Sequence, residues 1–492
     1  MEDNKKKTEL SSVSYEGQIS STKNILSNII VVIFSNLLTT LSGVLIGFII
    51  PKIMGIIDFG YYKTFTLYAS YIGLFHFGFI DGIYLYYAGK KYDELDKEKF
   101  RLFTHFLFFI TLIITLIFIS IGCCLYGIDA GLILIFVGLD VMTSIMTCYY
   151  ETLTQITMQF KKLSFRSVLT TSLKIVSVVV LYLLYKFAKM TIYFWIYIVC
   201  YLVIKYILTF WYIFTYRDIS FGKGVKFKDV KGEIFNYYKI GFPLLVSNLV
   251  GQFIFIVDQQ IVNIFFDVQT YSTYAFAYSM INLITIATSA ISTVLYPTLK
   301  TMDENQVKED YSKLNAILLI FISFCLLSYF MLVPFISFFL ADYIPSLITF
   351  RIVLPGVLIS SSISVIKYNC YKKFNMIGNY FIKSLIILII AIIADLAVFY
   401  IFKSTNGISI ISIFVLILWY ILIELNFIRK YHVHWMRNFA YMVLSIANFY
   451  ACTFIPNIWG GMGIYVLNFA LLSIIIYNKK LSDIISLFFR KR

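Results

Sequence analysis

Residues 51–82, PKIMGIIDFGYYKTFTLYASYIGLFHFGFIDG, decide the class of protein to which this chain belongs. The stretch opens on a Pro-Lys turn and continues as an apolar, aromatic run with glycines scattered through it. Such a run suits a helix that crosses a bilayer, which takes about 20 mostly apolar residues. Asp81 lies near its end, and a carboxylate inside a membrane helix is costly enough to predict a functional site or an internal partner.

The whole chain has the composition of an integral membrane protein. Of its 492 residues, 60% are hydrophobic and only 14% are charged, whereas about a quarter of the residues in soluble domains are charged. The formal net charge of +15 would suggest nucleic-acid binding in a soluble protein. Lys and Arg retained on the cytoplasmic side of a membrane explain this charge better, so we expect no nucleic-acid partner.

The apolar runs predict an all-α polytopic membrane protein with about fourteen transmembrane helices. The expected spans are residues 25–50, 61–89, 102–126, 131–155, 168–187, 190–216, 240–266, 270–296, 314–341, 346–370, 379–402, 407–428, 436–455 and 458–477. The loops that this count places inside carry 31 of the 41 Lys and Arg residues, and six lie within spans. The exterior loops carry the other four, Lys52, Lys186, Lys189 and Lys403. Because positive charge is retained inside, both termini are expected in the cytoplasm.

Several classes of function are disfavoured by what the sequence lacks. The expected exterior loops are too short to build a catalytic domain, and no G-x-x-x-x-G-K-[ST] phosphate loop occurs. The seven cysteines show no C-x-x-C spacing, so they predict neither a metal site nor a disulfide framework. We therefore expect a protein that is not an enzyme and that holds no metal and no cofactor.

A weak internal repeat divides the chain. When the sequence is shifted by 212 residues, FSNLL (34–38) falls on VSNLV (246–250) and Tyr62 falls on Tyr274. Parallel repeats about an axis along the membrane normal are common in transporters. The expected organisation is a cytoplasmic tail (1–24), a six-helix bundle (25–216), a basic cytoplasmic linker (217–239), a second six-helix bundle (240–428), and two extra spans with a basic tail (429–492).

Several motifs carry a family resemblance. The segments PKIMG (51–55), DFGYY (58–62) and AGKK (88–91), with YYKIGFPLLVSNLVGQFIFIVDQQIV (237–262) and STVLYPTLK (292–300), resemble the polysaccharide biosynthesis family. Its members include the O-antigen and capsule repeat-unit flippases (Wzx-type) of the MOP transporter superfamily.

This resemblance implies two bundles in a V-shaped, MATE-like arrangement around a central cavity that opens alternately to each side of the bacterial cytoplasmic membrane. It also implies a cargo of undecaprenyl-pyrophosphate-linked oligosaccharide, contact with membrane lipids, and contact with the glycan polymerase machinery.

Charged residues within the expected spans are candidate site residues, because hydrocarbon makes them costly. The basic ones are Lys63, Lys174, Lys205, Arg351, Lys367 and Lys383, and the acidic ones are Asp81, Asp140, Glu151, Asp258, Asp395 and Glu424. Lys63 and Lys383 lie within a turn of a span end, where they can extend to the headgroups. Lys367 and Glu424 are expected close enough to the inner surface to reach it. Pro355-Gly356 predicts a kink in its span.

Helical spacing predicts which polar residues share a face. Lys63, Ser70 and Asp81 align on the second expected span, and a stripe from Asp140 to Glu151 runs along the fourth. The seventh span carries Asn248, Gln252, Gln259 and Asn263 on one face. Such stripes serve either to join helices by hydrogen bonds or to line a wet cavity, and for the fourth and seventh spans we favour the cavity.

The chemistry of the implied cargo suggests roles for these residues. A pyrophosphate that loses water must gain cations in exchange. We therefore expect Lys174, Lys205 and Arg351, together with Lys63, to contact the anionic head. Asp81, Asp140 and Asp258 would pair with these cations when the cavity is empty, or bind a coupling cation. The other polar residues expected to line the cavity, to gate it or to couple transport to an ion are Glu151, Asn248, Gln252, Gln259 and Asp395.

Alternatives remain open at this point. A multidrug or metabolite cation antiporter of the same superfamily would have the same architecture, and so would a flippase for the lipid-linked peptidoglycan precursor. A cation antiporter favours an acidic cavity, and equal numbers of basic and acidic residues within the spans argue modestly against it. Proton or sodium coupling through Asp140 or Asp258 is compatible with the sequence, which does not demand it.

Overall fold

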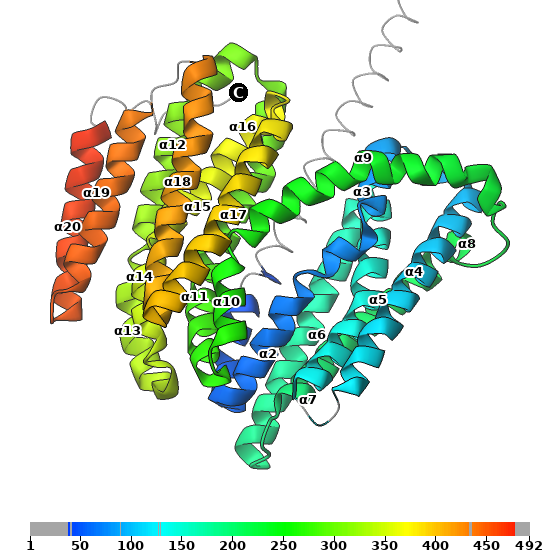
Figure 1. The fold of residues 1–492 in the computed structure, drawn as a ribbon, viewed down its shortest axis with the longest axis horizontal. Helices are drawn as coiled ribbons and strands as arrows, with labels where there is room; N and C mark the ends of the chain where they lie inside the picture. The colour runs from blue at the N-terminus through cyan, green and yellow to red at the C-terminus, as the bar shows by residue number, and fades with distance from the viewer. Residues whose placement is uncertain are drawn as a thin grey trace, which may run out of the picture.

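The computed structural model describes residues 38–39, 42–88, 90–125, 127, 129–431 and 435–477. Within these residues the chain folds into helices and contains no strand. The helices form two groups that lean together at one end and separate at the other, as the arms of a V (Figure 1). The predicted all-α membrane fold is confirmed.

The first arm follows the helix Ser42–Met54. It contains α2 (Ile56–Ala69), α3 (Phe79–Tyr87), α4 (Lys97–Cys124), α5 (Asp129–Ile156), α6 (Phe160–Phe187), α7 (Phe194–Thr215) and the short α8 (Arg217–Ser220). A long helix, α9 (Phe227–Phe253), then crosses from this arm to the other along the upper end of the molecule in Figure 1. More than half of the residues expected to form a linker are thus helical.

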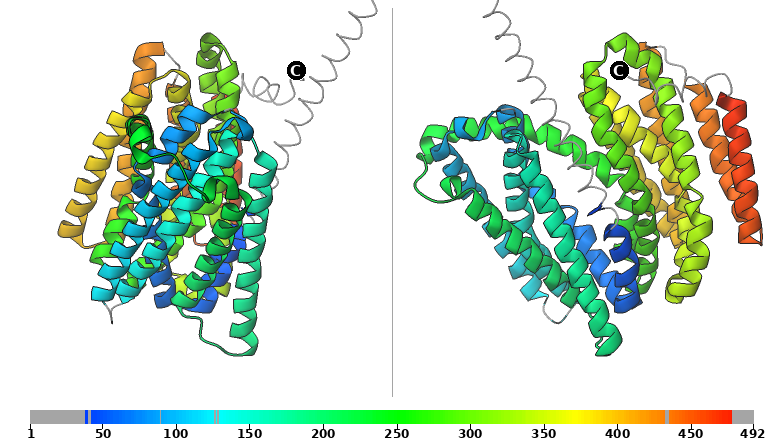
Figure 2. Two further views of the ribbon diagram at one scale, coloured as in Figure 1. Left: turned by 90° about the vertical axis from the view of Figure 1, so that its right-hand side faces the viewer. Right: turned by 180° about the vertical axis from the view of Figure 1, so that it is seen from behind.

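The second arm begins after α9. It contains α10 (Val257–Phe265), α11 (Val268–Thr301), α12 (Glu304–Cys325), α13 (Ser328–Phe339), α14 (Ser346–Val353), α15 (Gly356–Ser361), α16 (Tyr368–Lys373), α17 (Ile377–Phe402) and α18 (Thr405–Tyr431). The pair α19 (Met436–Thr453) and α20 (Ile458–Tyr477) lies at the outer edge of this arm, as the right-hand view in Figure 2 shows.

The chain crosses the membrane several times. Among the described residues, eight helices are long and apolar enough to span a bilayer, or ten if each of two bent pairs is one span. The expected count of about fourteen is not confirmed, partly because several expected spans are interrupted helices. The bent pair α14 and α15–α16 turns by 45° at Pro355-Gly356, so the predicted kink is confirmed.

The second expected span is broken, and the prediction of one continuous stripe through Lys63, Ser70 and Asp81 is wrong. After α2 the chain forms a 3₁₀ turn from Ile72 to His76 and then α3. Phe77 and Gly78 between them have φ angles of 48° and 84°. These left-handed angles end a helix, so Lys63 and Asp81 lie on two separate helices.

The glycines of this stretch serve a helix crossing. A Cβ on Gly241 of α9 would lie 1.9 Å from the carbonyl oxygen of Gly78. Backbone therefore meets backbone where α9 passes over α3, and Phe79 packs beside Tyr237 and Tyr238. The crossing requires a residue without a side chain.

Gly241→Ala is expected to destabilise the protein by about 1–3 kcal/mol or more, because the added methyl overlaps backbone that cannot move aside. Gly232→Ala is the matched control, since it lies on the same helix and has nothing within 4 Å of the added Cβ. The control should be neutral or stabilise by up to about 1 kcal/mol. Thermal unfolding of the detergent-solubilised protein measures both, and equal melting temperatures for the two variants would contradict the crossing.

The two arms meet through α2 and the start of α11. The Phe59 ring of α2 lies 6.0 Å from Phe276 of α11 and 5.6 Å from Tyr343, and Asn263 donates a hydrogen bond to Thr64 at 2.7 Å. This contact lies at the end opposite the basic loops. There Asp267 caps α11, and hydrogen bonds from Thr270 lower the pKa of Asp267.

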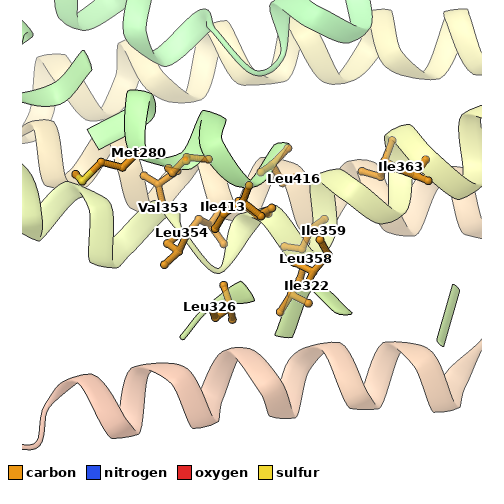
Figure 3. Close-up of a cluster of buried hydrophobic side chains, with 14 of the residues drawn as sticks. Met280, Ile322, Leu326, Val353, Leu354, Leu358, Ile359, Ile363, Ile413 and Leu416 are labelled. Carbon is orange, nitrogen blue, oxygen red and sulfur yellow. The ribbon is translucent and has the colours of Figure 1, made fainter. Parts of the chain in front are cut away.

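The second arm has an apolar core of close-packed aliphatic side chains. Figure 3 shows Ile322 of α12 and Leu326, which directly follows that helix, lying against Leu354 and Leu358, with Ile413 of α18 beyond them. These residues are buried, and burying one such side chain contributes about 1.5–3 kcal/mol. This core holds together α12, α14, α15 and α18 of the second arm.

Candidate functional site

A cavity of about 1080 Å³ lies where the arms face each other. Its walls come from α2, from the bend between α9 and α10, and from α11, α14–α16 and α18. The bend turns the chain by 63° after Phe253, so the backbone of the seventh expected span enters the cavity wall instead of passing straight through the bilayer.

Hydroxyl and amide groups line much of this wall in two adjacent rows. The row on α11 consists of Ser279, Asn282, Thr285, Thr288 and Ser292. The row on α15–α16 consists of Ser360, Ser361, Ser364, Tyr368 and Asn369. Asn369 joins the rows with a 2.8 Å hydrogen bond to Ser292. Groups that both donate and accept hydrogen bonds suit a ligand rich in hydroxyls.

Among the described residues, three charged ones line the cavity: Lys63, Lys372 and Asp258. The Lys63 ammonium lies over the rings of Phe59 and Tyr62, 5.2 and 5.7 Å from their centroids. In the part of the chain that the structure describes, this ammonium has no ion pair and no hydrogen bond. Lys372 lies 4.1 Å from the centroid of the Tyr368 ring. The lining therefore offers two cations.

The third charged residue, Asp258, accepts hydrogen bonds from neighbouring residues of the protein. Tyr274 and Tyr278 both donate hydrogen bonds to its Oδ2, and the backbone N–H of Gln259 donates to its Oδ1 at 2.7 Å. Nearby, Asp395 of α17 is 1% exposed, and its Oδ1 has no partner among the described residues. The tyrosines thus share one carboxylate oxygen of Asp258, and the other accepts the backbone N–H of Gln259.

The polar residues predicted on the seventh span divide between the two helices. Gln252 and Gln259 line the cavity, and Asn248 accepts a hydrogen bond from the lining residue Tyr368. Asn263 instead joins α10 to α2. The predicted stripe thus serves both of the roles weighed for it.

The stripe on α5 does not line this cavity. Asp140 pairs with Lys205 of α7 and accepts hydrogen bonds from Thr143 and Ser144 at 3.1 and 3.0 Å. Thr147 and Thr209 form a further bond between the helices. Within the described residues, these contacts join α5 to α7 inside the first arm.

Four further predicted residues also lie outside the cavity lining. Lys174 lies 5.1 Å from the Tyr201 ring centroid in the first arm, where Glu151 is partly buried. Asp81 approaches His76 at 3.9 Å in the first turn of α3. Arg351 lies over the Phe454 ring at 4.9 Å, toward the outer helix pair. The structure thus brings Lys63, Gln252, Asp258 and Gln259 together in the lining, and Asn248 contacts this lining through Tyr368.

Lys367 and Glu424 form a buried ion pair, so the expectation that they reach the inner surface is wrong. Their charged atoms lie 2.6 Å apart, and the side chains are 0% and 1% exposed. Ser362 and Tyr311 add hydrogen bonds of 3.2 and 2.8 Å. Helix packing, which sequence spacing does not reveal, encloses both side chains.

Sequence reasoning missed Lys372 and the serine row. Lys372 falls between the expected spans 346–370 and 379–402, whereas α16 carries it into the cavity lining. The spacing of Ser360, Ser364 and Tyr368 by four residues was a detectable signal for one helical face. Among the described residues, no group of three or more His, Cys, Asp or Glu side chains could hold a metal ion.

The fold is similar to those of solved membrane transporters. The lipid II flippase MurJ, in an inward closed conformation, matches with a TM-score of 0.66 and 16% sequence identity over 92% of this chain and 99% of its own. A multidrug resistance MATE family transporter of the MOP superfamily matches in its inward-facing conformation with a TM-score of 0.53 and 13% identity, over 82% of this chain and 93% of that chain. An outward-facing conformation of a multidrug resistance MATE family transporter matches with a TM-score of 0.51 and 10% identity, over 81% of this chain and 95% of that chain.

At these identities the likeness shows the fold alone. No protein-family model matches the sequence, and no curated protein matches it in sequence.

Proposed function

We propose that this protein is a flippase that moves undecaprenyl-pyrophosphate-linked oligosaccharide from the cytoplasmic to the outer leaflet by alternating access. The repeat units would serve O-antigen, capsule or exopolysaccharide biosynthesis. One observation carries the proposal: the cavity between the arms combines two rows of hydroxyl and amide groups with two lysines. This combination matches a sugar chain attached to phosphates.

A polar cavity would lower the cost of moving the cargo's phosphates and sugars through the membrane. Phosphates that leave water for hydrocarbon lose hydration free energy unless charged or hydrogen-bonding groups replace the water. Lys63 and Lys372 supply cations, and the hydroxyl rows supply partners for sugar hydroxyls. The volume of about 1080 Å³ lies at the upper end of ordinary ligand pockets, as an oligosaccharide head requires.

The remaining predicted cations keep their proposed role in another arrangement of the arms. Lys205 pairs with Asp140, as proposed for the empty protein, and Lys174 lies beside them. Release of this pair would present Lys174 and Lys205 to the anionic head. Arg351 lies over the ring of Phe454, which directly follows α19.

The basic loops suggest the orientation of the protein in the bacterial cytoplasmic membrane. With these loops inside, both termini are cytoplasmic. The arms then separate toward the cytoplasm in Figure 1, and the cavity would collect its cargo there. Contact with glycan polymerase machinery would occur on the opposite side, where the product emerges.

Asp258 and Asp395 offer a route for coupling to a proton or sodium gradient. Asp395→Asn is expected to abolish the response of transport to an imposed gradient, which for one charge is worth about 2.3 kcal/mol per 100 mV. The measurement is lipid flipping in proteoliposomes with and without the gradient. Asp342→Asn, an exposed acid in the loop before α14, is the control and should respond as the wild type does. An unchanged response in Asp395→Asn would remove it from the coupling route.

Two alternatives each have an observation in their favour. The likeness to the MurJ lipid II flippase favours transport of the lipid-linked peptidoglycan precursor, which shares the pyrophosphate head. The carboxylate of Asp258 in the cavity wall favours a cation antiporter. Against the antiporter, two lysines oppose one carboxylate whose oxygens already accept hydrogen bonds.

Loss of the gene distinguishes these functions. Mass spectrometry of undecaprenyl-linked lipids should show that a complete lipid-linked repeat unit accumulates while surface glycan disappears. Accumulation of the peptidoglycan precursor with cell lysis would favour the second function. Unchanged lipids with new sensitivity to cationic drugs would overturn the proposal in favour of the antiporter.

A further inference from the structure

One face of α9 is exposed and carries both lysines and phenylalanines. Lys228, Lys231, Phe235, Lys239 and Phe242 are all exposed. At 100° per residue they fall within an arc of about 80°. Phe235 is 70% exposed and Phe242 49%. We call these five residues the basic-aromatic face.

The charge of this face is not neutralised by acids of the same helix. Glu233 lies on another side and pairs with Lys99 of α4 at 2.7 Å. Asp229 lies about 120° from the centre of the arc. The face therefore presents three positive charges together with two aromatic rings.

The position of α9 places this face at the level of a membrane surface. The Lys99–Glu233 pair joins the first turns of α9 to the first turns of α4. Arg101 of α4 also donates a hydrogen bond to the carbonyl of Asp218, in the short α8 that precedes α9, at 2.7 Å. Since α4 is one of the helices apolar enough to span a bilayer, its first turns mark the headgroup layer.

We propose that the basic-aromatic face binds anionic phospholipid headgroups of the membrane in which the protein lies. The lysines attract phosphate groups, and the phenylalanine rings enter the boundary between headgroups and acyl chains. An acidic soluble partner would satisfy the lysines but would leave Phe235 to find its own apolar pocket. This inference does not depend on the identity of the cargo.

The binding would act on the helix that joins the two arms. The first half of α9 packs on α3 at Gly241, and beyond its last residue, Phe253, the chain bends into α10 and the cavity wall. A lipid layer that holds the exposed side of α9 therefore supports the element on which both arms depend.

The test uses the purified full-length protein in a mild detergent and measures bound phosphatidylglycerol and phosphatidylcholine by native mass spectrometry. The wild type should bind phosphatidylglycerol more tightly than phosphatidylcholine. The triple variant K228Q/K231Q/K239Q should lose this preference, with phosphatidylglycerol affinity reduced about 100-fold. The variant should fold normally because the three side chains are exposed, and an unchanged melting temperature verifies this.

A matched control removes the same charge elsewhere. K161Q/K162Q/K300Q takes three exposed lysines from the same end of the molecule but from other helices, and it should keep the preference. Phe235→Ser should weaken binding of both lipids about tenfold or more. Equal losses in the two triple variants, no preference in the wild type, or unchanged binding in Phe235→Ser would each overturn the proposal.

Discussion

Lys63→Gln is expected to reduce export of the lipid-linked glycan about 10- to 100-fold without reducing the amount of protein in the membrane. The Lys63 ammonium lines the cavity and lies over two aromatic rings, with no acidic partner among the described residues. Its charge is thus available to a ligand, and a charge-assisted hydrogen bond contributes about 1.5–3 kcal/mol. Glutamine keeps a polar group on a side chain one atom shorter, but it loses the charge.

The stability of this variant separates transport from folding. An isolated ammonium in a membrane protein costs free energy, so the glutamine variant should melt at the same temperature as the wild type or higher. Lys63→Arg should retain much of the export, since a guanidinium also binds phosphate. Lys186→Gln, which removes an exposed charge at the far end of α6, is the control. Normal export by Lys63→Gln would exclude Lys63 as a contact of the anionic head.

Lys367→Met is expected to destabilise the protein by about 3–5 kcal/mol, because it leaves the buried Glu424 carboxylate without its counter-ion. The two side chains are almost completely enclosed, and within the described residues Glu424 Oε1 has no hydrogen-bond partner. Methionine fills the space of the lysine stem, so little of the loss comes from packing. Thermal or denaturant unfolding in detergent measures the change.

The double variant K367M/E424L tests whether the loss comes from the unpaired charge. Replacement of both members of a buried pair by apolar residues is often neutral or stabilising, so most of the stability should return. Lys313→Met is the control, since Lys313 pairs with Asp310 at 2.9 Å but keeps 29% of its side chain exposed. Its loss should stay below about 1 kcal/mol. A double variant as unstable as Lys367→Met would show that the charge is not the cause.

The buried pair illustrates where prediction from sequence failed. Lys367 and Glu424 lie near the ends of their expected spans, which suggested that they reach the surface. The structure instead turns them toward each other between α16, α18 and α12. Distance from a span end predicts whether a side chain can reach the headgroups, but the packing of neighbouring helices decides whether it does.

The interrupted helices are a second reason why the sequence did not predict the candidate site correctly. A regular helix would place Lys63 and Asp81 on one stripe, yet the left-handed residues Phe77 and Gly78 separate them. The bend after Phe253 likewise divides the polar residues of the seventh span. Apolar runs predict which segments enter a membrane, but apolarity does not reveal a break, because broken and continuous helices are equally apolar.

By itself, the sequence determined the environment and the class of fold. Hydropathy and the distribution of Lys and Arg are sums over many residues, so they identify a helical membrane protein even where single boundaries are wrong. Only the tertiary structure decided which polar groups meet. It brought Lys63, Asp258 and Lys372 to one cavity, enclosed Lys367 with Glu424, and placed Asp140 against Lys205. Helical spacing specifies the face on which a residue lies, whereas the partner of that face depends on how helices far apart in the chain pack together.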